Sequence, residues 1–260
     1  MARKTADERA EKKKDKEEVA TASMSVVEHL KELRDRVLWS IIAIAVGAVI
    51  CFIFFEQILD LMVEPYRDAT TSKAFPNGKS LVFTQPLEAF MTRIKVAAYG
   101  GFVIASPMVF FHLWRFITPG LNPKEKKYAI PFVTASVILF AGGSTVAIIT
   151  FPKALNFLLN IGGNDLDALL TAGSYLTLVF LMILAFGVSF EFPIVMMFLL
   201  LARIITTQQL RKIRRFTFLG LVVFAAVITP SQDPISLFAM AVPMYLLYEG
   251  SIIIGRLLKR

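Results

Sequence analysis

The chain has 260 residues, of which 56% are hydrophobic and 18% are charged, and its formal net charge is +8 at pH 7. A mean hydropathy of +0.63 is typical of a protein that crosses a bilayer several times. It excludes a soluble domain, because a chain of this length could not bury so much apolar surface. We attribute the positive charge to membrane topology and not to a nucleic-acid-binding surface.

Six apolar stretches, each followed by a polar or proline-marked break, predict an all-α polytopic membrane protein with six transmembrane helices. Most have the roughly 17–25 residues that a helix needs to cross about 30 Å of hydrocarbon. Around this domain we expect a disordered, charged, cytoplasmic N-terminus at 1–23 and a cytoplasmic tail at 256–260. The expected domain covers 24–255, with spans at about 37–55, 96–117, 128–150, 170–201, 216–229 and 235–254 and a first outer loop at 56–95.

Lys and Arg residues concentrate in the N-terminal segment, in the breaks after the second and fourth stretches, and in the tail. By the positive-inside rule these regions are cytoplasmic, so both termini are expected inside. A cleavable signal peptide is not expected, because the first apolar stretch is long and five more follow it.

The residues just before the first stretch predict an amphipathic helix at the cytoplasmic surface. At 100° per residue, His29, Glu32 and Arg36 fall on one stripe beside an apolar stripe. An ordinary charged juxtamembrane helix has a similar pattern. The positive-inside rule explains Arg34 and Arg36, however, and gives no reason for an acid among these basic residues. Glu32 is therefore a candidate binding residue.

The break after the second stretch contains Phe116, Pro119, Leu121 and Glu125. Pro119 and the glycine after it predict a sharp turn. Pro123 can open the next helix, which places Glu125 in a first turn where a carboxylate suits the helix dipole. Helix capping and ligand binding are both open for Glu125 on this pattern alone.

Glu191 lies inside the fourth stretch, with long apolar runs on both sides. An ionisable side chain inside the membrane costs at least about 2.5 kcal/mol, so it needs a partner or a wet cavity and is a functional candidate. A neighbouring Ser or Thr could instead satisfy it as a structural residue. Pro193 frees a backbone carbonyl and predicts a kink next to it.

The chain resembles the TatC family, the polytopic receptor subunit of the twin-arginine protein translocase. The resemblance rests on the run from His29 to Arg36, on the run from Phe116 to Leu121 with Glu125, and on the run from Phe186 to Pro193. It departs from the family pattern at Ser231-Gln232, which separates Pro230 from Asp233 and leaves the role of Asp233 open. The resemblance implies structural roles for Pro65, Pro107, Pro119, Pro193 and Pro243.

This resemblance implies a protein that binds the paired arginines of signal peptides on folded proteins. It assigns the binding to Glu32 and Glu125, while Phe116 and Leu121 shape the adjacent surface. Two carboxylates suit two guanidinium groups, because each can form a charge-assisted, bidentate pair that a lysine cannot form. We expect the remaining charged residues of the cytoplasmic helix, His29, Arg34 and Arg36, to orient it, with the arginines anchored against phosphate headgroups.

The resemblance also implies partners and a location. Single-span subunits of the TatA/TatB type would mediate export with this chain, driven by the proton-motive force, and Glu191 would belong to an intramembrane polar pocket that contacts them. The expected location is the bacterial cytoplasmic (inner) membrane. A homo-oligomer within a larger complex is expected, bound to the lipid bilayer and to no nucleic acid.

Two other function classes are a secondary transporter and an intramembrane hydrolase. A secondary transporter of a small solute could use Glu191 as its coupling site, but the two halves show no inverted repeat, since the first outer loop has about 40 residues and the last about five. An intramembrane hydrolase is a weaker alternative, because neither His29 nor His112 belongs to a catalytic motif. We therefore expect no catalytic residues, cofactor or metal.

The last two spans are expected to be short. The fifth has about 14 residues, or roughly 21 Å of helix, and Pro243 and Glu249 interrupt the sixth. Such a mismatch is relieved by bilayer thinning or by helix association. We expect a concave face with a buried polar pocket, and we expect single-span partners to dock on the face built by 216–229 and 235–248.

Overall fold

The computed structural model describes residues 2–70, 81–117, 129–161 and 170–257, with side chains placed from Val27 onward except at 67–70 and 129. Within these ranges the chain is almost entirely helical, as expected. The helices are α1 (Ala2–Ile53), α2 (Phe55–Thr70), α3 (Pro86–Ile117), α4 (Ala129–Ile161), α5 (Ala172–Ser189), α6 (Phe192–Leu201), α7 (Thr207–Lys212), α8 (Arg214–Ile228) and α9 (Pro234–Leu257).

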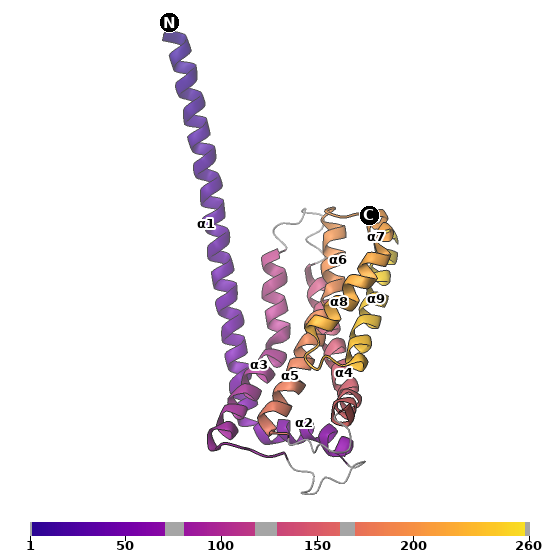
Figure 1. Cartoon of the computed structure of the whole chain (residues 1–260). Coiled ribbons are helices and arrows are strands. Elements are labelled where there is room, and N and C mark those ends of the chain that lie inside the picture. The colour runs from indigo at the N-terminus through magenta and orange to yellow at the C-terminus, as the bar shows by residue number, and fades with distance from the viewer. Residues whose placement is uncertain (1, 71–80, 118–128, 162–169, 258–260) are drawn as a thin grey trace.

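Figure 1 shows α1, α3, α4, α5 with α6, α8 and α9 running between the two ends of a helical bundle. The N-terminal part of α1 extends beyond one end, where α9 also finishes, and we call this the termini end. Helix α2 lies across the opposite end, which we call the α2 end. The two termini therefore lie on the same side of the bundle.

Helix α1 begins at Ala2 and includes most of the segment 1–23, whose expected disorder stays a prediction. Ala, Glu and Lys, which are strong helix formers, make up most of this segment. Helix propensity therefore explains a helical backbone in a segment whose composition alone predicts disorder.

The described chain contains five segments that are long and apolar enough to cross a membrane, which is the architecture of a polytopic membrane protein. Helix α8 lies where the fifth span is expected, but its 15 residues reach only about 22 Å. It is as short as the sequence predicts, and a total of six crossings stays a prediction. The five segments are Val27–Ile53, Pro86–Ile117, Ile130–Ile161, Ala172–Leu201 and Pro234–Leu257.

Helix α9 corrects the expectation of a short sixth helix. It runs for 24 residues, about 36 Å, although Pro243 and Glu249 both lie inside it. A carboxylate oxygen of Glu249 lies 2.5 Å from Nη2 of Arg214, and the other accepts the Tyr245 hydroxyl at 3.2 Å. Glu249 was expected to interrupt the apolar segment. Its charge is paired with Arg214 of α8, and α9 continues past this residue.

The fourth apolar stretch is divided into α5 and α6 at Phe190 and Glu191. Pro193 lies in the first turn of α6 and has no N–H with which to continue the hydrogen-bond ladder of α5. The N–H of Glu191 bonds the carbonyl of Val188 at 3.1 Å instead, in a tighter turn. The predicted kink is confirmed, and it places Glu191 at the break itself.

The segment 56–95, expected to be one outer loop, contains most of α2 and the first turns of α3. Pro65 lies inside α2, and Pro107 lies inside α3. Before α3, Val82 pairs with the residues that open α5, and its carbonyl accepts the N–H of Ala172 at 3.0 Å. Helix α2 and the short backbone pairing at Val82 therefore cover the α2 end of the bundle.

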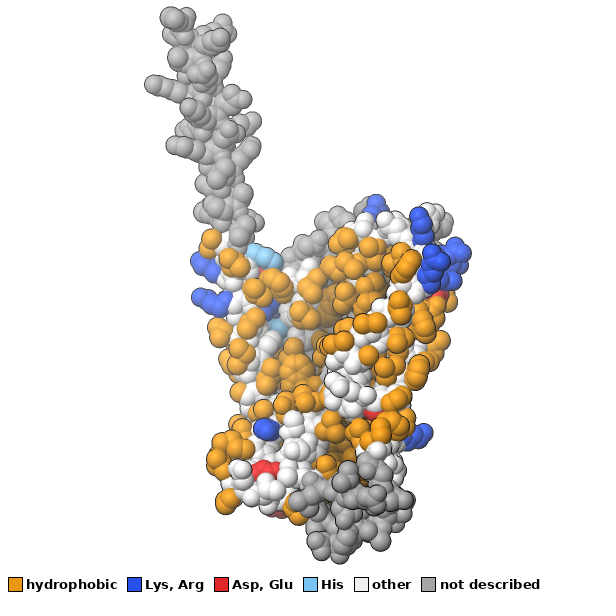
Figure 2. Space-filling model, in the orientation of Figure 1, with side chains coloured by type: hydrophobic (Ala, Val, Ile, Leu, Met, Phe, Trp, Pro, Cys, Tyr) orange, Lys and Arg blue, Asp and Glu red, His pale blue; other side chains and the backbone are white. Residues whose placement is uncertain are grey.

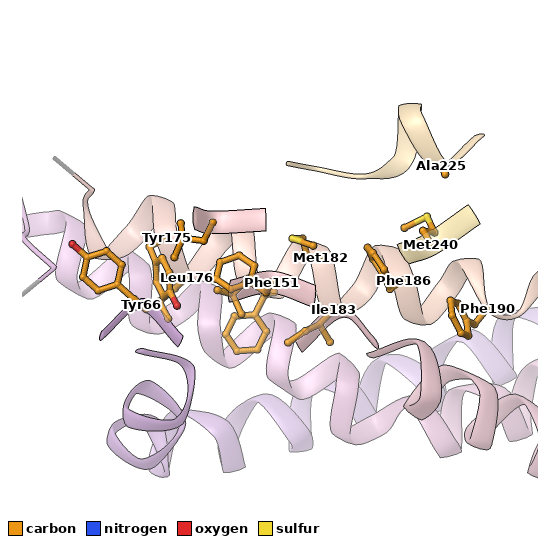
Figure 3. Packing of buried hydrophobic residues seen from close by; sticks show 14 of the residues in the cluster. Tyr66, Phe151, Tyr175, Leu176, Met182, Ile183, Phe186, Phe190, Ala225 and Met240 are labelled. Atoms are coloured by element: carbon orange, nitrogen blue, oxygen red, sulfur yellow. The ribbon is translucent and has the colours of Figure 1, made fainter. Parts of the chain in front are cut away.

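The largest hydrophobic cluster is centred on α5 and joins it to its neighbours (Figure 3). The Tyr175 hydroxyl donates to the carbonyl of Met62 at 2.8 Å, and its ring lies edge-on to Tyr66 with centroids 5.3 Å apart. The same cluster includes Ala225 of α8 and Met240 of α9, both fully buried. Helix α5 is thus the central support of the bundle.

Helices α1 and α3 approach each other closely at two glycines, Gly47 and Gly101. A Cβ atom added at Gly101 would lie 2.5 Å from the backbone nitrogen of Ala48, and one at Gly47 would lie 2.6 Å from the carbonyl oxygen of Gly101. Small residues let membrane helices pack backbone against backbone. This contact fixes the position of α1, which carries Glu32 at the termini end.

Candidate functional site

Glu32 lies on α1 at the termini end, with 35% of its side chain exposed. Its Oε1 atom accepts hydrogen bonds from both Nε of Arg36, at 3.2 Å, and Nη2 of the same guanidinium. The Nδ1 atom of His29 lies 3.9 Å from the second oxygen, Oε2. Residues three and four positions apart are neighbours on a helix surface, so the stripe expected from the sequence produces this cluster.

His29 also connects α1 to α3. Its ring stacks on Phe116, with ring centroids 4.4 Å apart and an interplanar angle of 13°. Phe116 is the next-to-last residue of α3, so the Glu32 carboxylate lies near the C-terminal end of α3. Arg115 adds a further positive charge to the surroundings of Glu32.

The other residues predicted to bind or shape the signal peptide, Leu121 and Glu125, lie outside the described residues, as does Pro119, for which a structural role was expected. Helices α3 and α4, which flank this segment, end and begin at the termini end (Figure 1). The distance from Glu125 to Glu32 therefore stays a prediction.

Arg34 and Arg36 occupy different positions, although similar roles were expected for them. Arg34 is 67% exposed and pairs with Asp35, whose Oδ1 lies 2.9 Å from Nε and 2.7 Å from Nη2. Arg36 is only 16% exposed, because its guanidinium lies against Glu32. Arg34 lies at the surface, whereas Arg36 is engaged by the candidate binding residue.

Glu191 lies half-buried at the break between α5 and α6. The hydroxyl of Ser136, on α4, is the neighbouring side-chain group that interacts with its carboxyl group. The same hydroxyl oxygen accepts the indole N–H of Trp114, on α3, at 2.7 Å. Ser136 therefore lies between the intramembrane glutamate and α3, two residues before Phe116.

The Ser136 hydroxyl satisfies only part of the Glu191 carboxyl group. Oε1 of Glu191 and the hydroxyl of Ser189 are buried atoms that have no hydrogen-bond partner among the described residues. Buried polar atoms in a membrane bundle are normally paired, so two unpaired ones within one turn suggest a place for a polar ligand or water. The expected intramembrane polar pocket at the break between α5 and α6 stays a prediction.

Asp233 forms the N-cap of α9, a role that the sequence left open. Its Oδ1 accepts the backbone N–H of Ser236 at 2.8 Å, and its Oδ2 accepts the hydroxyl of Ser231 at 2.5 Å. Gln232 has a left-handed backbone with φ of 48° and turns the chain toward this cap. The side chain of Asp233 is almost fully buried, so we assign it to helix capping.

Trp114 and Ser136 were not among the residues predicted from the sequence. A serine in a membrane helix commonly bonds its own backbone, so its presence does not indicate a contact between helices. The only sequence feature that pointed to these two residues was the position of Trp114 close to the run from Phe116 to Leu121. Within the described ranges, no group of three or more His, Cys, Asp or Glu side chains is placed to hold a metal ion.

Figure 2 shows hydrophobic side chains over the middle of one face of the bundle, with most Lys and Arg side chains near the termini end. The last turn of α7 and the first of α8 supply four of these basic residues: Arg211, Lys212, Arg214 and Arg215. An apolar belt with a basic end is the surface expected of a protein that crosses a bilayer.

The chain is similar to proteins of known family. The family described as Sec-independent protein translocase protein (TatC) matches residues 28–243. The TatC protein of Frankia casuarinae is 43% identical over 243 residues, which cover 91% of this chain and 67% of that protein. The TatC protein of Aquifex aeolicus is 38% identical over 240 residues, with 91% and 97% covered. A crystal structure of the twin-arginine translocase receptor TatC in DDM has a TM-score of 0.72 and 37% identity, covering 87% of this chain and 99% of that one.

Proposed function

The chain belongs to the TatC family of Sec-independent protein translocase proteins, and we propose that it is the receptor that binds the paired arginines of signal peptides on folded proteins. The family supports a protein translocase component over a transporter of small solutes. The observation that carries the receptor role is the position of the Glu32 carboxylate, which lies at the termini end and is tied to Phe116 through His29.

The chemistry of Glu32 supports recognition of arginine in particular. Its carboxylate already accepts two N–H donors from one guanidinium, that of Arg36, so its environment accommodates a planar fork of donors. A lysine ammonium is more strongly hydrated and lacks this fork. A signal peptide with two lysines would therefore bind more weakly than one with two arginines.

Glu125 supplies the second carboxylate in this proposal, one for each arginine of the signal. It follows α3 in the sequence, and α3 ends beside Glu32 through the stacking of His29 on Phe116. Phe116 and Leu121 provide apolar surface for the residues that flank the arginine pair. Arg34, which is exposed on α1, contacts lipid phosphate groups.

Single-span partners of the TatA/TatB type dock, in this proposal, on α8 and α9, where they reach the Glu191 pocket. Helix α8 is too short to match the bilayer, so association with another helix would relieve the mismatch. One of its faces exposes large apolar side chains, while Leu221 and Ala225 are buried in the bundle. The exposed side chains on this face are Phe216, Leu219, Val223 and Val227, and Phe218, Phe224 and Ile228 are exposed elsewhere on the helix.

The proposed location is the bacterial cytoplasmic membrane, with the termini end on the cytoplasmic side. The basic residues of α7 and α8 and both termini lie at this end, which agrees with the positive-inside rule. Export would be driven by the proton-motive force, in a larger complex that contains several copies of this chain.

The proposal can be tested with the full chain in lipid nanodiscs and fluorescent signal peptides. We expect Glu32→Gln and Glu125→Gln each to weaken binding of the twin-arginine peptide about 10- to 100-fold, the equivalent of about 1.5–3 kcal/mol for one charge-assisted hydrogen bond. Glu28→Gln is the matched control, because Glu28 is an exposed acid on the same helix. Unchanged affinity in both variants, or equal binding of Arg-Arg and Lys-Lys peptides, would refute the receptor role.

A further inference from the structure

We propose that Arg36 is an internal competitor for the signal-binding carboxylate, which the signal peptide must displace, and that His112 receives the displaced guanidinium. This inference rests on the proposed receptor function. It adds two specificity-determining residues to the site, one of which the sequence assigned to helix orientation and the other to no role.

One oxygen of the Glu32 carboxylate is already engaged by a guanidinium. Both Nε and Nη2 of Arg36 donate to Oε1 of Glu32, whereas a bidentate pair with a signal arginine needs Oε1 and Oε2 together. Only 16% of the Arg36 side chain is exposed, against 67% for Arg34 on the same helix. A signal arginine and Arg36 cannot use this oxygen in the same way at once, so binding requires exchange.

The displaced Arg36 has an acceptor nearby on α3. Both ring nitrogens of His112 are buried and have no hydrogen-bond partner among the described residues. Helices α1 and α3 run in opposite directions from the stacked pair of His29 and Phe116. Arg36 lies two turns along α1 from this pair while His112 lies one turn along α3, so both lie on the same side of it. A neutral imidazole offers one acceptor nitrogen, which could take an N–H of the guanidinium after it leaves Glu32. His112 thereby lowers the cost of the exchange.

The competition explains why one arginine is not enough. Arg36 is attached one helical turn from Glu32, so its effective concentration at the carboxylate is high. A ligand with a single arginine competes poorly with it. A ligand with two arginines is held by the second one while the first competes, so its first arginine also competes intramolecularly. Arg36 therefore lowers the affinity for ligands with one arginine more than the affinity for ligands with two.

Binding of three peptides, with Arg-Arg, Lys-Arg and Lys-Lys pairs, to the full chain in nanodiscs tests this inference. We expect Arg36→Gln to bind the Arg-Arg peptide about tenfold more tightly, because a competing charge-assisted bond is removed. The Lys-Arg peptide should gain at least as much, so that discrimination between the two narrows. Arg36→Lys, which keeps the charge and loses the fork, should show a smaller gain.

Lys31→Gln is the matched control, since it removes one positive charge from an exposed position on the same helix. It should produce no tightening. Unchanged or weaker binding by both Arg36 variants, in protein that is monodisperse and keeps its thermal midpoint, would overturn the inference. The receptor proposal would survive that result if the wild type still prefers Arg-Arg and Glu32→Gln still loses affinity; if those two results fail, both proposals fall.

His112→Phe separates the acceptor role from packing, because it keeps an aromatic ring and removes both nitrogens. In the wild-type background it should weaken binding of the Arg-Arg peptide about threefold or more, since Arg36 loses its alternative partner. In the Arg36→Gln background it should have no effect. An equal loss in the two backgrounds would show that His112 acts without Arg36 and would overturn its assignment as acceptor.

Discussion

The indole Nε1 of Trp114 lies 2.7 Å from the hydroxyl oxygen of Ser136, and this hydrogen bond joins α3 to α4 inside the bundle. The Ser136 hydroxyl also interacts with the carboxyl group of Glu191. One buried serine thus connects three parts of the fold, and its loss would leave the indole N–H without its partner where water is scarce.

Ser136→Ala should destabilise the fold by about 1–2 kcal/mol, because the indole N–H loses its hydrogen bond and the carboxyl of Glu191 loses a polar neighbour. Thr145→Ala is the control on the same helix: Thr145 is exposed and its hydroxyl bonds only the carbonyl of Ala141, at 2.8 Å, in its own helix. Equilibrium unfolding in mixed micelles measures both variants. Equal stability of the two would mean that the serine is not an essential junction.

Glu191→Ala should leave binding of the signal peptide intact and reduce transport about tenfold or more, because the carboxyl lies at the α5–α6 break, away from Glu32. Transport into vesicles and peptide binding are measured in parallel. Glu56→Ala, which removes an exposed acid on α2, should alter neither. Normal transport by Glu191→Ala would show that the residue is only structural.

Asp233→Ala should lower the free energy of unfolding by about 0.5–2 kcal/mol, because α9 loses its N-cap and the N–H of Ser236 loses its acceptor. Asp233→Asn should lose less, since asparagine keeps an acceptor oxygen and is a good N-cap. Thermal unfolding of the purified variants compares them. A greater loss with asparagine than with alanine would argue that the negative charge, and not the cap, is what matters.

Gly101→Ala should destabilise the contact of α1 with α3 by about 1–3 kcal/mol, because the new Cβ would meet the backbone of Ala48 and Ile44 at 2.5–2.8 Å. Gly142→Ala is its control, since nothing lies within 4 Å of a Cβ at that position. Unfolding free energies of the pair provide the measurement. Similar values for both would mean that α1 can shift at no cost.

Single cysteines on the exposed face of α8, at Leu219, Val223 and Val227, should crosslink to a cysteine in a single-span partner. Cysteines at Leu221 and Ala225, which are buried on the opposite face, should not. Cysteine crosslinking in membranes, in a Cys51→Ala background, reads out both sets. Crosslinks from exposed positions of α1, and none from α8, would show that the partner docks on α1 and not on α8.

The sequence alone determined the features that depend on local spacing. Apolar length and composition predicted a helical membrane protein, because a bilayer demands long apolar helices. Pro193 predicted the break beside Glu191, since a missing N–H acts on its own helix. The stripe of His29, Glu32 and Arg36 was likewise readable, because residues three and four apart on a helix are neighbours wherever the helix lies.

Only the tertiary structure decided which side chains meet across helices. The stacking of His29 on Phe116, and the contacts from Trp114 through Ser136 to Glu191, join residues far apart in the chain. The pairing of Glu249 with Arg214 is of the same kind, and it makes α9 longer than its charge pattern predicts. Helical periodicity specifies which face a residue occupies but not which helix lies opposite, because that depends on how all the helices pack at once.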